Sequence, residues 1–556
     1  MACSSTKGCF RDGTCQKEVR DIAGASQDSL TVTPTVGSTG PIWVGANSLR
    51  NNQLFNREKI PPRPVHAKGG VAFGKFKCTS SILGDLTDNV ALQKGKITSI
   101  VARFSTVIGD RGSPDAVREP RGFAVRFYTD QGNWDLVGNN TPTFFLRDPA
   151  LFNIFVNSQR PQKDGLPSST NQTDWFSLRP ECMMQLMFMF TRRGIPTDFR
   201  HMDGFSSHTY ILHKKCGKKE RLTAVQFHWR SRQGIRGLSD AEAATVRGND
   251  VNSSVRDLRD SIAKKNFPQW DLFVQLVPIK KDCHGNYVTV PKDFPIDIND
   301  LTKVWPTTLV KEVKVGEMIL DRNPKDNFTQ NEELAFCVSN FIPGIGPSND
   351  RVLQFRILAY TDQHLYRIGA NFHRLDVNKP RSCPISSGSR AQCPFNFVID
   401  GSMADGYRKY AIYAPNSYPP TPVTPVEVDP KFKPSDVPPP VVKQDLDHRG
   451  RCSKKEECRV GYTSTKDDDN YSQPCMFYLT MPFEVRNELA ANFASFLNAV
   501  LNEKRSISKE VYHRFLSRLG EVSSDLRARV VAAQEGTVLP PGPPVKQDTG
   551  YEFMLP

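Results

Sequence analysis

The feature that most constrains the fold is an alternating run inside residues 103–149. Phe123, Val125 and Phe127 occupy every second position of the segment FAVRFY. This is the period-two pattern of a strand with one buried face. The four residues of 130–133, Asp-Gln-Gly-Asn, then supply the turn chemistry of a hairpin. The stretch therefore predicts a strand, a glycine- and charge-rich loop, a strand, a turn and a further strand.

Further alternating runs of the same kind flank this hairpin on both sides. They are Ile97–Val107, Thr209–Leu212, Leu222–Trp229 and Trp270–Val277. Several short strands at this density predict an antiparallel β-barrel. Two short helices are expected between them, at Leu238–Val246 and Val255–Lys265. The segment Cys283–Pro343 has no clear periodicity, and we expect it to be mostly irregular and to wrap around the rest.

The C-terminal third changes character twice. Ten prolines between Pro415 and Pro440 indicate a semi-rigid connector. From about Pro482 the apolar period becomes 3.6, with stripes that predict a small helical domain. We expect the tail beyond Pro544 to be mobile.

The chain is accordingly predicted to be an α+β protein with four parts. These are an N-terminal arm, partly disordered, at 1–55, a β-barrel domain at 56–375, a wrapping and proline-rich connector at 376–475, and a C-terminal helical domain with its tail at 476–556.

Composition excludes several classes of protein. Of the 556 residues, 24% are charged and 38% are apolar, as in a soluble globular protein. No run approaches the roughly 18 apolar residues of a membrane span, so we predict no membrane partner. The N-terminus lacks the apolar segment of a secretory leader, and the last residues are not a Ser-Lys-Leu type address. We therefore expect a cytoplasmic or peroxisomal protein.

Neither the cysteines nor the positive net charge predicts a bound metal or nucleic acid. Thirteen cysteines at irregular spacing predict reduced thiols, and the six-residue intervals at the N-terminus and near residue 455 do not match zinc-ligand pairs. The formal net charge is +14, and the densest basic cluster, around Cys216-Gly217, lies between two predicted strands. A solvated hairpin tip explains this cluster, and we predict no nucleic-acid partner.

Arg356 and Tyr360 form a candidate functional pair. Pro347-Ser348 is a plausible helix start, and the apolar pattern that follows fits a helix within residues 344–369. In a strand these two residues would be about 13 Å apart, whereas in a helix they are neighbours separated by about 6 Å of rise. Only the helix lets the guanidinium bond the phenolic oxygen. A partly buried tyrosine beside a surface arginine is the plainer alternative.

Four separated motifs, one of which contains this pair, can be compared with those of known families. They are VHAKGG around His66, RFST around Ser105, DLVGNN around Asn139 and RILAYTDQH around Tyr360. In this order and over about residues 56–533 the chain resembles the haem (monofunctional) catalases. The resemblance implies a haem b cofactor (iron protoporphyrin IX) with Tyr360 as the iron ligand; tyrosine is the general haem ligand of catalases. It also implies catalytic roles for His66 and Asn139, with Ser105 holding the imidazole.

The resemblance implies further cofactor-binding residues. Arg356 would stabilise the Tyr360 phenolate. Arginine forks suit the two haem propionates, and apolar residues would wall the ring. The implied cofactor set is Tyr360, Arg356, Arg63, Arg103, Arg367, Val65, Phe144, Phe152 and Phe155. Val65 and Val107 match residues that narrow the entry channel in the family.

The sequence also differs from the family's motifs at several identifiable positions. Leu358, Gln363 and Pro62 replace other residues of the family's motifs, and Glu119 stands where the channel usually carries an aspartate. None of these changes removes a reacting group. For NADPH, which some catalases bind, Thr191, Arg193 and Trp305 match. Four further positions, Met184, Asp203, Arg230 and Thr307, do not. The sequence therefore argues against tight NADPH binding.

The resemblance predicts a haem catalase that decomposes hydrogen peroxide to water and dioxygen, assembled as a homotetramer. Two alternatives remain open at this point. One is a catalase-like haem peroxidase or hydroperoxide isomerase, and the other is a non-enzymatic haem-binding protein of catalase-like fold. Val65 and Val107 speak against the first, and the intact His66, Asn139 and Tyr360 speak against the second.

Overall fold

The computed structural model describes residues 35–36, 40–41, 47–216, 219–281, 287–291, 294–380 and 468–555. By its internal contacts the chain divides into two units, Met1–Pro61 and Pro62–Pro556. In the first unit, strands β1 (Thr35–Val36) and β2 (Gly40–Pro41) pair antiparallel, and helix α1 spans Asn47–Arg57. Most of the predicted arm and connector lies outside the described residues, as do the regularly spaced cysteines Cys3, Cys9, Cys15, Cys452 and Cys458.

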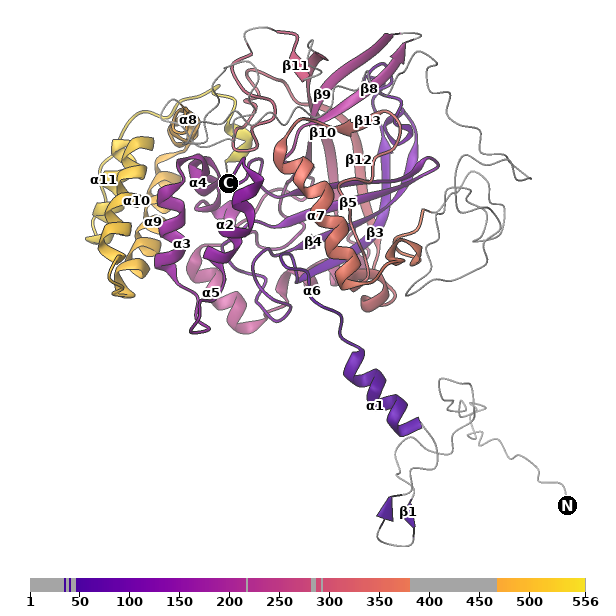
Figure 1. Ribbon diagram of the computed structural model, residues 1–556. Helices are drawn as coiled ribbons and strands as arrows, with labels where there is room; N and C mark the ends of the chain where they lie inside the picture. Colours follow the sequence, from indigo (N-terminus) through magenta and orange to yellow (C-terminus); the bar gives the residue numbers. More distant parts are fainter. Residues whose placement is uncertain are drawn as a thin grey trace, which may run out of the picture. The chain divides into compact units, whose positions relative to one another are not determined.

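A closed antiparallel barrel forms the centre of the second unit (Figure 1). Its strands in chain order are β3 (Gly69–Cys78), β4 (Ile97–Ser105), β5 (Gly122–Thr129), β6 (Gly132–Asn139), β7 (Gly204–Phe205), β9 (Lys219–Ser231), β10 (Gln269–Lys281) and β12 (Val313–Arg322). Pairing of β10 with β9, from Trp270 opposite Ser231 to Ile279 opposite Leu222, closes the ring. Three further strands extend it, namely β8 (Tyr210–Cys216), β11 (Tyr287–Thr289) and β13 (Ile345–Pro347).

The predicted hairpin and barrel are confirmed. β5 and β6 pair from Gly122 opposite Asn139 to Thr129 opposite Gly132, and β8 and β9 form the hairpin around the basic tip. The described part of Cys283–Pro343 is mostly irregular, as expected, but it contains strand β12, which the sequence analysis did not predict. β3 was also missed, since its three glycines weaken the strand pattern. Gly74 is required there, because a Cβ would come within 1.9 Å of the Ile319 carbonyl oxygen.

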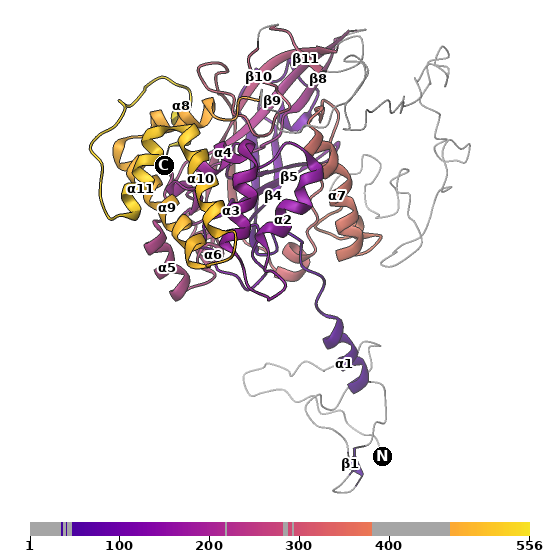
Figure 2. The same ribbon diagram turned by 60° about the vertical axis from the view of Figure 1, so that its left-hand side comes forward.

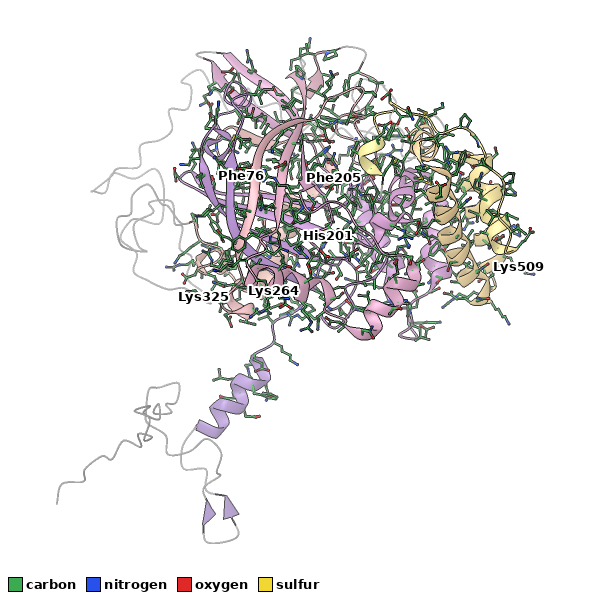
Figure 3. All side chains as sticks on the ribbon, turned by 180° about the vertical axis from the view of Figure 1, so that it is seen from behind. Phe76, His201, Phe205, Lys264, Lys325 and Lys509 are labelled. Carbon is green, nitrogen blue, oxygen red and sulfur yellow. The ribbon has the colours of Figure 1, made fainter. Side chains whose placement is uncertain are left out.

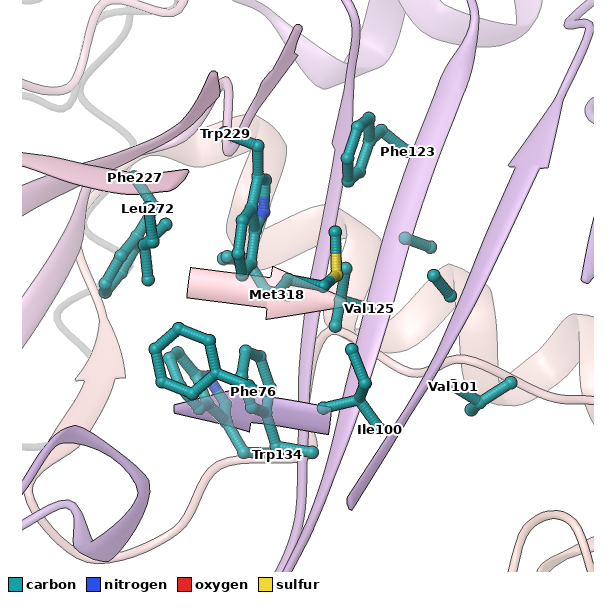
Figure 4. Close-up of a cluster of buried hydrophobic side chains, with 14 of the residues drawn as sticks. Phe76, Ile100, Val101, Phe123, Val125, Trp134, Phe227, Trp229, Leu272 and Met318 are labelled. Carbon is teal, nitrogen blue, oxygen red and sulfur yellow. The ribbon is translucent and has the colours of Figure 1, made fainter. Parts of the chain in front are cut away.

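Aromatic rings fill the barrel, as is usual where a small barrel leaves room only for side chains. Figure 4 shows Phe76, Trp134 and Trp229 among the packed side chains. The Phe76 ring meets Trp229 edge-on at 5.9 Å, and Trp134 stacks on Phe127 at 4.4 Å. All are at most 2% exposed. The interior is therefore a packed core, and the ligand cavity must lie outside it.

Helices from two distant parts of the chain share a second core. They are α2 (Phe152–Gln159), α3 (Ser169–Leu178), α4 (Met183–Met189), α8 (Ser472–Thr480), α9 (Phe483–Asn502), α10 (Ser508–Val522) and α11 (Ser524–Gln534). Figures 1 and 2 show α9–α11 beside α3 and α4. The predicted apolar stripes are buried here: Phe493 stacks on Phe190 at 4.2 Å.

Three more helices lie against the barrel or near it. Helix α5 (Asp240–Asn249) begins with a capping box between Ser239 and Glu242. Helix α6 (Ser253–Ala263) contacts β3 and β12. Helix α7 (Arg351–Arg367) carries the candidate Arg356 and Tyr360. Among the described residues, no helix is long and apolar enough to cross a membrane.

The C-terminal tail is packed, so the expectation that it is mobile beyond Pro544 is wrong. Tyr551 and Met554 are 5% and 0% exposed and belong to the helical core. Thr307 N–H donates to the Gly550 carbonyl (3.0 Å), which joins the tail to the segment after β11. The proline-rich and polar sequence before Tyr551 has no periodic signal, and the tail is anchored by single buried side chains, Tyr551 and Met554.

Candidate active site

A cavity of about 840 Å³ lies beside the barrel, between the ends of β4–β6 and the helices α2 and α7. This volume is in the range of cofactor sites, roughly 300–1,000 Å³. Its lining includes His66, Ser105, Asn139, Arg356 and Tyr360. Segments up to about 290 residues apart in the sequence thus bring the predicted reacting groups to one cavity.

Backbone and side-chain contacts both fix His66. Its φ is 63°, in the left-handed region that non-glycine residues rarely adopt and that surrounding contacts must enforce. His66 N–H donates to the Val107 carbonyl at 2.7 Å, and its ring Nδ1 lies 2.9 Å from Ser105 Oγ. Gly122 leaves room for this pair: a Cβ there would lie 2.3 Å from Ser105 Oγ and 2.7 Å from His66 Nδ1.

The surroundings keep the His66 imidazole neutral. Burial, together with the positive charges of Arg103 and Arg356, lowers the pKa of His66 to about 3. At neutral pH the ring therefore has one nitrogen that can accept a proton and one that carries a proton. Because Nδ1 is engaged by Ser105, Nε2 is the nitrogen left for a ligand in the cavity.

Asn139 is the last residue of β6, where it pairs with Gly122 of β5 and Phe205 of β7. It is half-buried and lines the cavity. Its neighbour Asn140 is buried and instead accepts a hydrogen bond from the Arg121 N–H at 2.7 Å. The two consecutive asparagines thus separate, one toward the cavity and one into the structure.

Helix α7 presents the tyrosine. The Arg356 guanidinium donates from Nη2 to Tyr360 Oη at 2.7 Å and from Nη1 to the Val137 carbonyl at 3.3 Å. Burial lowers the pKa of Arg356, but Tyr360 and Tyr210 outweigh this and raise it overall. The predicted helix and its four-residue pair are confirmed. A permanent positive charge therefore donates a hydrogen bond to the phenolic oxygen.

A buried His208–Asp350 pair supports this helix, and the sequence analysis did not find it. The Asp350 side chain caps α7 by accepting from Val352 N–H (2.9 Å) and Leu353 N–H (3.2 Å), and its other oxygen lies 2.5 Å from His208 Nδ1. Both side chains are 2% exposed, and His208 also lines the cavity. Burial lowers the pKa of His208, against the raising effect of Asp350. The helix-start rule could have identified Asp350 as a cap; no local signal links it to a histidine 142 residues earlier.

Three arginines gather at one end of the cavity. Arg63 Nη2 donates to the Asn331 carbonyl at 2.7 Å, Arg103 Nε donates to Asn331 Oδ1 at 3.0 Å, and Arg367 Nη2 donates to the Glu332 carbonyl at 2.8 Å. Asn331, on the π-helix Phe328–Glu332 (η5), links two of them and was not anticipated. Burial first, and then Arg103 and Arg367, lower the pKa of Arg63. Burial lowers the pKa of Arg103 to about 10, against the raising effect of Glu332.

The apolar wall is only partly as expected. Val65, Phe144 and Phe152 line the cavity, and the rings of Phe144 and Phe152 stack at 6.4 Å. Phe155 lies behind them, with its ring 4.7 Å from Phe145 and from Trp175. Arg367 is likewise not among the cavity-lining residues.

Comparisons with known proteins agree on one family. The catalase family profile matches residues 21–420. A catalase of Helicobacter pylori is 38% identical over 482 residues, covering 86% of this chain and 88% of the relative. A catalase of Cavia porcellus is 39% identical over 473 residues, covering 84% and 82%. A solved structure described as a bacterial catalase superimposes with a TM-score of 0.79 at 33% identity, covering 94% of this chain and 97% of the other.

Proposed function

The chain belongs to the catalase family and is a haem catalase that decomposes hydrogen peroxide, and we propose that His66, Asn139 and Tyr360 are its reacting and iron-binding residues. The observation that carries this assignment is the single cavity lined by all three side chains. Relatives and fold do not favour the two alternatives, a haem peroxidase or hydroperoxide isomerase and a non-enzymatic haem-binding protein.

We propose that the haem is haem b, because the cavity has the charge pattern that a ring with two carboxylates requires. Within the described residues, the buried Arg63 Nη1 has no hydrogen-bond partner. The positive charges of Arg63, Arg103 and Arg367 repel one another in a buried place. Two propionates would supply the missing acceptors and compensate these charges. Val65, Phe144 and Phe152 provide the apolar wall for the ring faces.

Haem, when bound, supplies the iron whose redox chemistry lets peroxide act first as oxidant and then as reductant. The protein must move a proton from one peroxide oxygen to the other. Neutral His66 can take that proton on Nε2 and return it, while the Ser105 contact to Nδ1 keeps the ring in place. The Asn139 amide can hold the peroxide by a hydrogen bond without competing for the proton.

Tyr360 would hold the haem iron through its phenolate oxygen. A free phenol titrates near 10, so the oxygen needs cationic neighbours to bind as an anion. Arg356, 2.7 Å away, is one such neighbour, and the metal itself is another. The Asp350 cap and its buried histidine fix the start of the helix that carries both residues.

Replacement of the iron ligand tests this assignment. Tyr360→Phe removes only the oxygen, so we expect the purified variant to retain far less haem per chain, measured from the Soret band and by extraction of the pigment. Mass spectrometry of the extract from the unaltered protein should give protoporphyrin IX. Tyr512→Phe, on α10 in the helical core, is the matched control and should keep its haem. Full haem content in Tyr360→Phe would refute the role of Tyr360.

We further propose that the chain does not bind NADPH tightly, because its own tail occupies Arg193, one of the matching residues, and Arg230 beside it. Arg193 pairs with Asp203 at 2.6 Å and donates to the carbonyls of Phe553 (2.7 Å) and Leu555 (3.1 Å). The Phe553 ring lies under the Arg230 guanidinium, 4.7 Å from it. Phe553 also packs 6.2 Å from the ring of Phe205, which is labelled in Figure 3.

A fluorescence titration with NADPH checks this proposal. The intact protein should show no saturable binding. In a variant that lacks residues 549–556, the tail no longer covers Arg193 and Arg230. Saturable NADPH binding by this variant would show that the tail prevents binding, and its absence would show that Asp203 is enough to prevent it. Stoichiometric, saturable binding to the intact chain would contradict the proposal.

We also propose a homotetramer. Large apolar side chains near the mouth of the cavity are exposed, with Leu358 and Tyr366 of α7 at 73% and 77% and Ile154 of α2 at 57%. Such side chains on a monomer indicate a surface that other subunits cover. Light scattering on the eluting protein should give a mass of about four times the 62.4 kDa chain. A mass of one or two chains would refute the tetramer.

A further inference from the structure

Glu119 has contacts that are not typical of a solvent-facing carboxylate. Its Oε1 accepts a hydrogen bond from Val107 N–H at 2.9 Å, and its Oε2 accepts one from Ile108 N–H at 3.0 Å. Both oxygens are therefore used to hold the backbone just after β4. Glu119 is half-buried and is not among the residues that line the cavity.

The segment that Glu119 holds is the one that fixes His66. Val107 N–H donates to Glu119 Oε1, and the Val107 carbonyl accepts from His66 N–H at 2.7 Å. His66 has a left-handed backbone with φ 63°, a conformation that persists only when its surroundings impose it. Movement of Val107 would therefore release the bond that keeps His66 in this conformation.

The backbone around Glu119 is held in turn by the buried Arg121 side chain. The Arg121 guanidinium, 1% exposed, donates to the carbonyls of Asp115 (2.8 Å), Val117 (2.7 Å) and Glu119 (2.6 Å). The Arg121 N–H is bound by Asn140 at 2.7 Å. The backbone of Glu119 is thus fixed, and the position of its carboxylate depends on the length of its side chain.

We propose that Glu119 is a positioning residue for His66, acting through Val107, and that the reach of its side chain matters more than its charge. The inference rests on the proposed role of His66. Aspartate is shorter by one C–C bond, about 1.5 Å, so from the same fixed backbone it would lose both backbone bonds while keeping the charge. Glutamine keeps the reach and one acceptor oxygen but loses the charge. Positioning therefore predicts that Glu119→Asp is the more damaging change, and a role as a fixed charge predicts the reverse.

Three measurements on the haem-loaded protein test this order. Hydrogen–deuterium exchange of Val107 and Ile108 amides should be about tenfold faster in Glu119→Asp and less affected in Glu119→Gln. Peroxide turnover per haem should fall about 10- to 100-fold in Glu119→Asp, the usual effect of a displaced catalytic group. The association rate of hydrogen cyanide, which must give its proton to a base as it binds, should fall in parallel. Glu484→Asp and Glu484→Gln, at the exposed start of α9, are the matched controls.

A double variant ties the effect to His66. If Glu119 acts through the imidazole, His66→Ala/Glu119→Asp should bind cyanide as slowly as His66→Ala alone. Unchanged exchange and cyanide rates in Glu119→Asp, or greater damage in Glu119→Gln than in Glu119→Asp, would overturn the inference. Retention of turnover by His66→Ala would overturn the proposed role of His66 instead. If Glu119→Asp does not accumulate as folded, haem-loaded protein, the reach argument is tested by Glu119→Gln, which should keep most of its cyanide rate; a fall in that rate as large as the one expected of Glu119→Asp would overturn the argument.

Discussion

The space left by Gly122 gives the sharpest prediction about the site. Gly122 opens β5 and pairs with Ser105 on one side and Asn139 on the other. In Gly122→Ala the new Cβ would lie 2.3 Å from Ser105 Oγ and 2.7 Å from His66 Nδ1, whereas ordinary contacts begin at 3.4 Å. The shortfalls are 3.4 − 2.3 = 1.1 Å and 3.4 − 2.7 = 0.7 Å. The hydroxyl or the imidazole must move by about that much.

The expected cost is catalytic rather than structural. A displacement of about 1 Å at a catalytic group costs on the order of 100-fold in rate, which equals about 2.7 kcal/mol of transition-state stabilisation. The three atoms nearest to this Cβ all belong to Ser105 and His66, and none belongs to Tyr360 or to Arg63, Arg103 and Arg367. We therefore expect Gly122→Ala to retain its haem while its turnover falls about 100-fold.

Initial rates of oxygen evolution, normalised to haem, measure this effect. Gly248→Ala on α5 is the matched control, because a Cβ there meets nothing within 4 Å; its rate and haem content should equal those of the unaltered protein. Thermal unfolding of both variants shows whether the fold is retained. Wild-type turnover in a haem-loaded Gly122→Ala would refute the reasoning, because it would show that turnover does not depend on the observed positions of His66 and Ser105.

Three further predictions concern stability and the helix that carries the tyrosine. Burial raises the pKa of Glu503, but hydrogen bonds from Thr170 and Ser168 outweigh this and bring it from 4.5 to about 2. The resulting stability is present above pH 4.5 and is lost as the pH falls toward 2. After allowance for solvent screening it amounts to about 1–2 kcal/mol, and Glu503→Gln should remove this slope from acid unfolding curves. Asp350→Ala removes a helix cap and leaves buried His208 unpaired, so denaturant unfolding should show a loss of about 2–4 kcal/mol together with weaker haem retention. Trp134→Ala, in the barrel core, should cost about 3–5 kcal/mol in the same measurement without changing turnover per haem in the folded fraction.

Local pattern was sufficient to predict the barrel and the arginine–tyrosine helix. The alternating apolar residues of β5 identified it as a strand, although all eight of its residues are buried and not one face alone. The four-residue spacing of Arg356 and Tyr360 has a physical meaning only on a helix. Glycine-rich β3 carries no such pattern, because what makes it a strand is its close approach to β12.

The contacts that the sequence could not reveal are those between distant residues. Asn331 binds two arginines more than 200 residues away, and His208 pairs with an aspartate on another element. Phe155, expected on the cavity wall, faces the helical core because α2 turns it toward Trp175. Pattern identifies which residue types can do the chemistry, but only packing decides which of them reach the cavity.

The most direct test of the account is the rate of oxygen evolution per haem by His66→Ala. The account predicts a protein with an unchanged Soret band and full haem content, because the iron is held from the side of Tyr360, and a turnover lower by about 100- to 10,000-fold. His213→Ala, on β8 and away from the cavity lining, should behave as the unaltered protein. Turnover at the wild-type rate in haem-loaded His66→Ala would contradict the account.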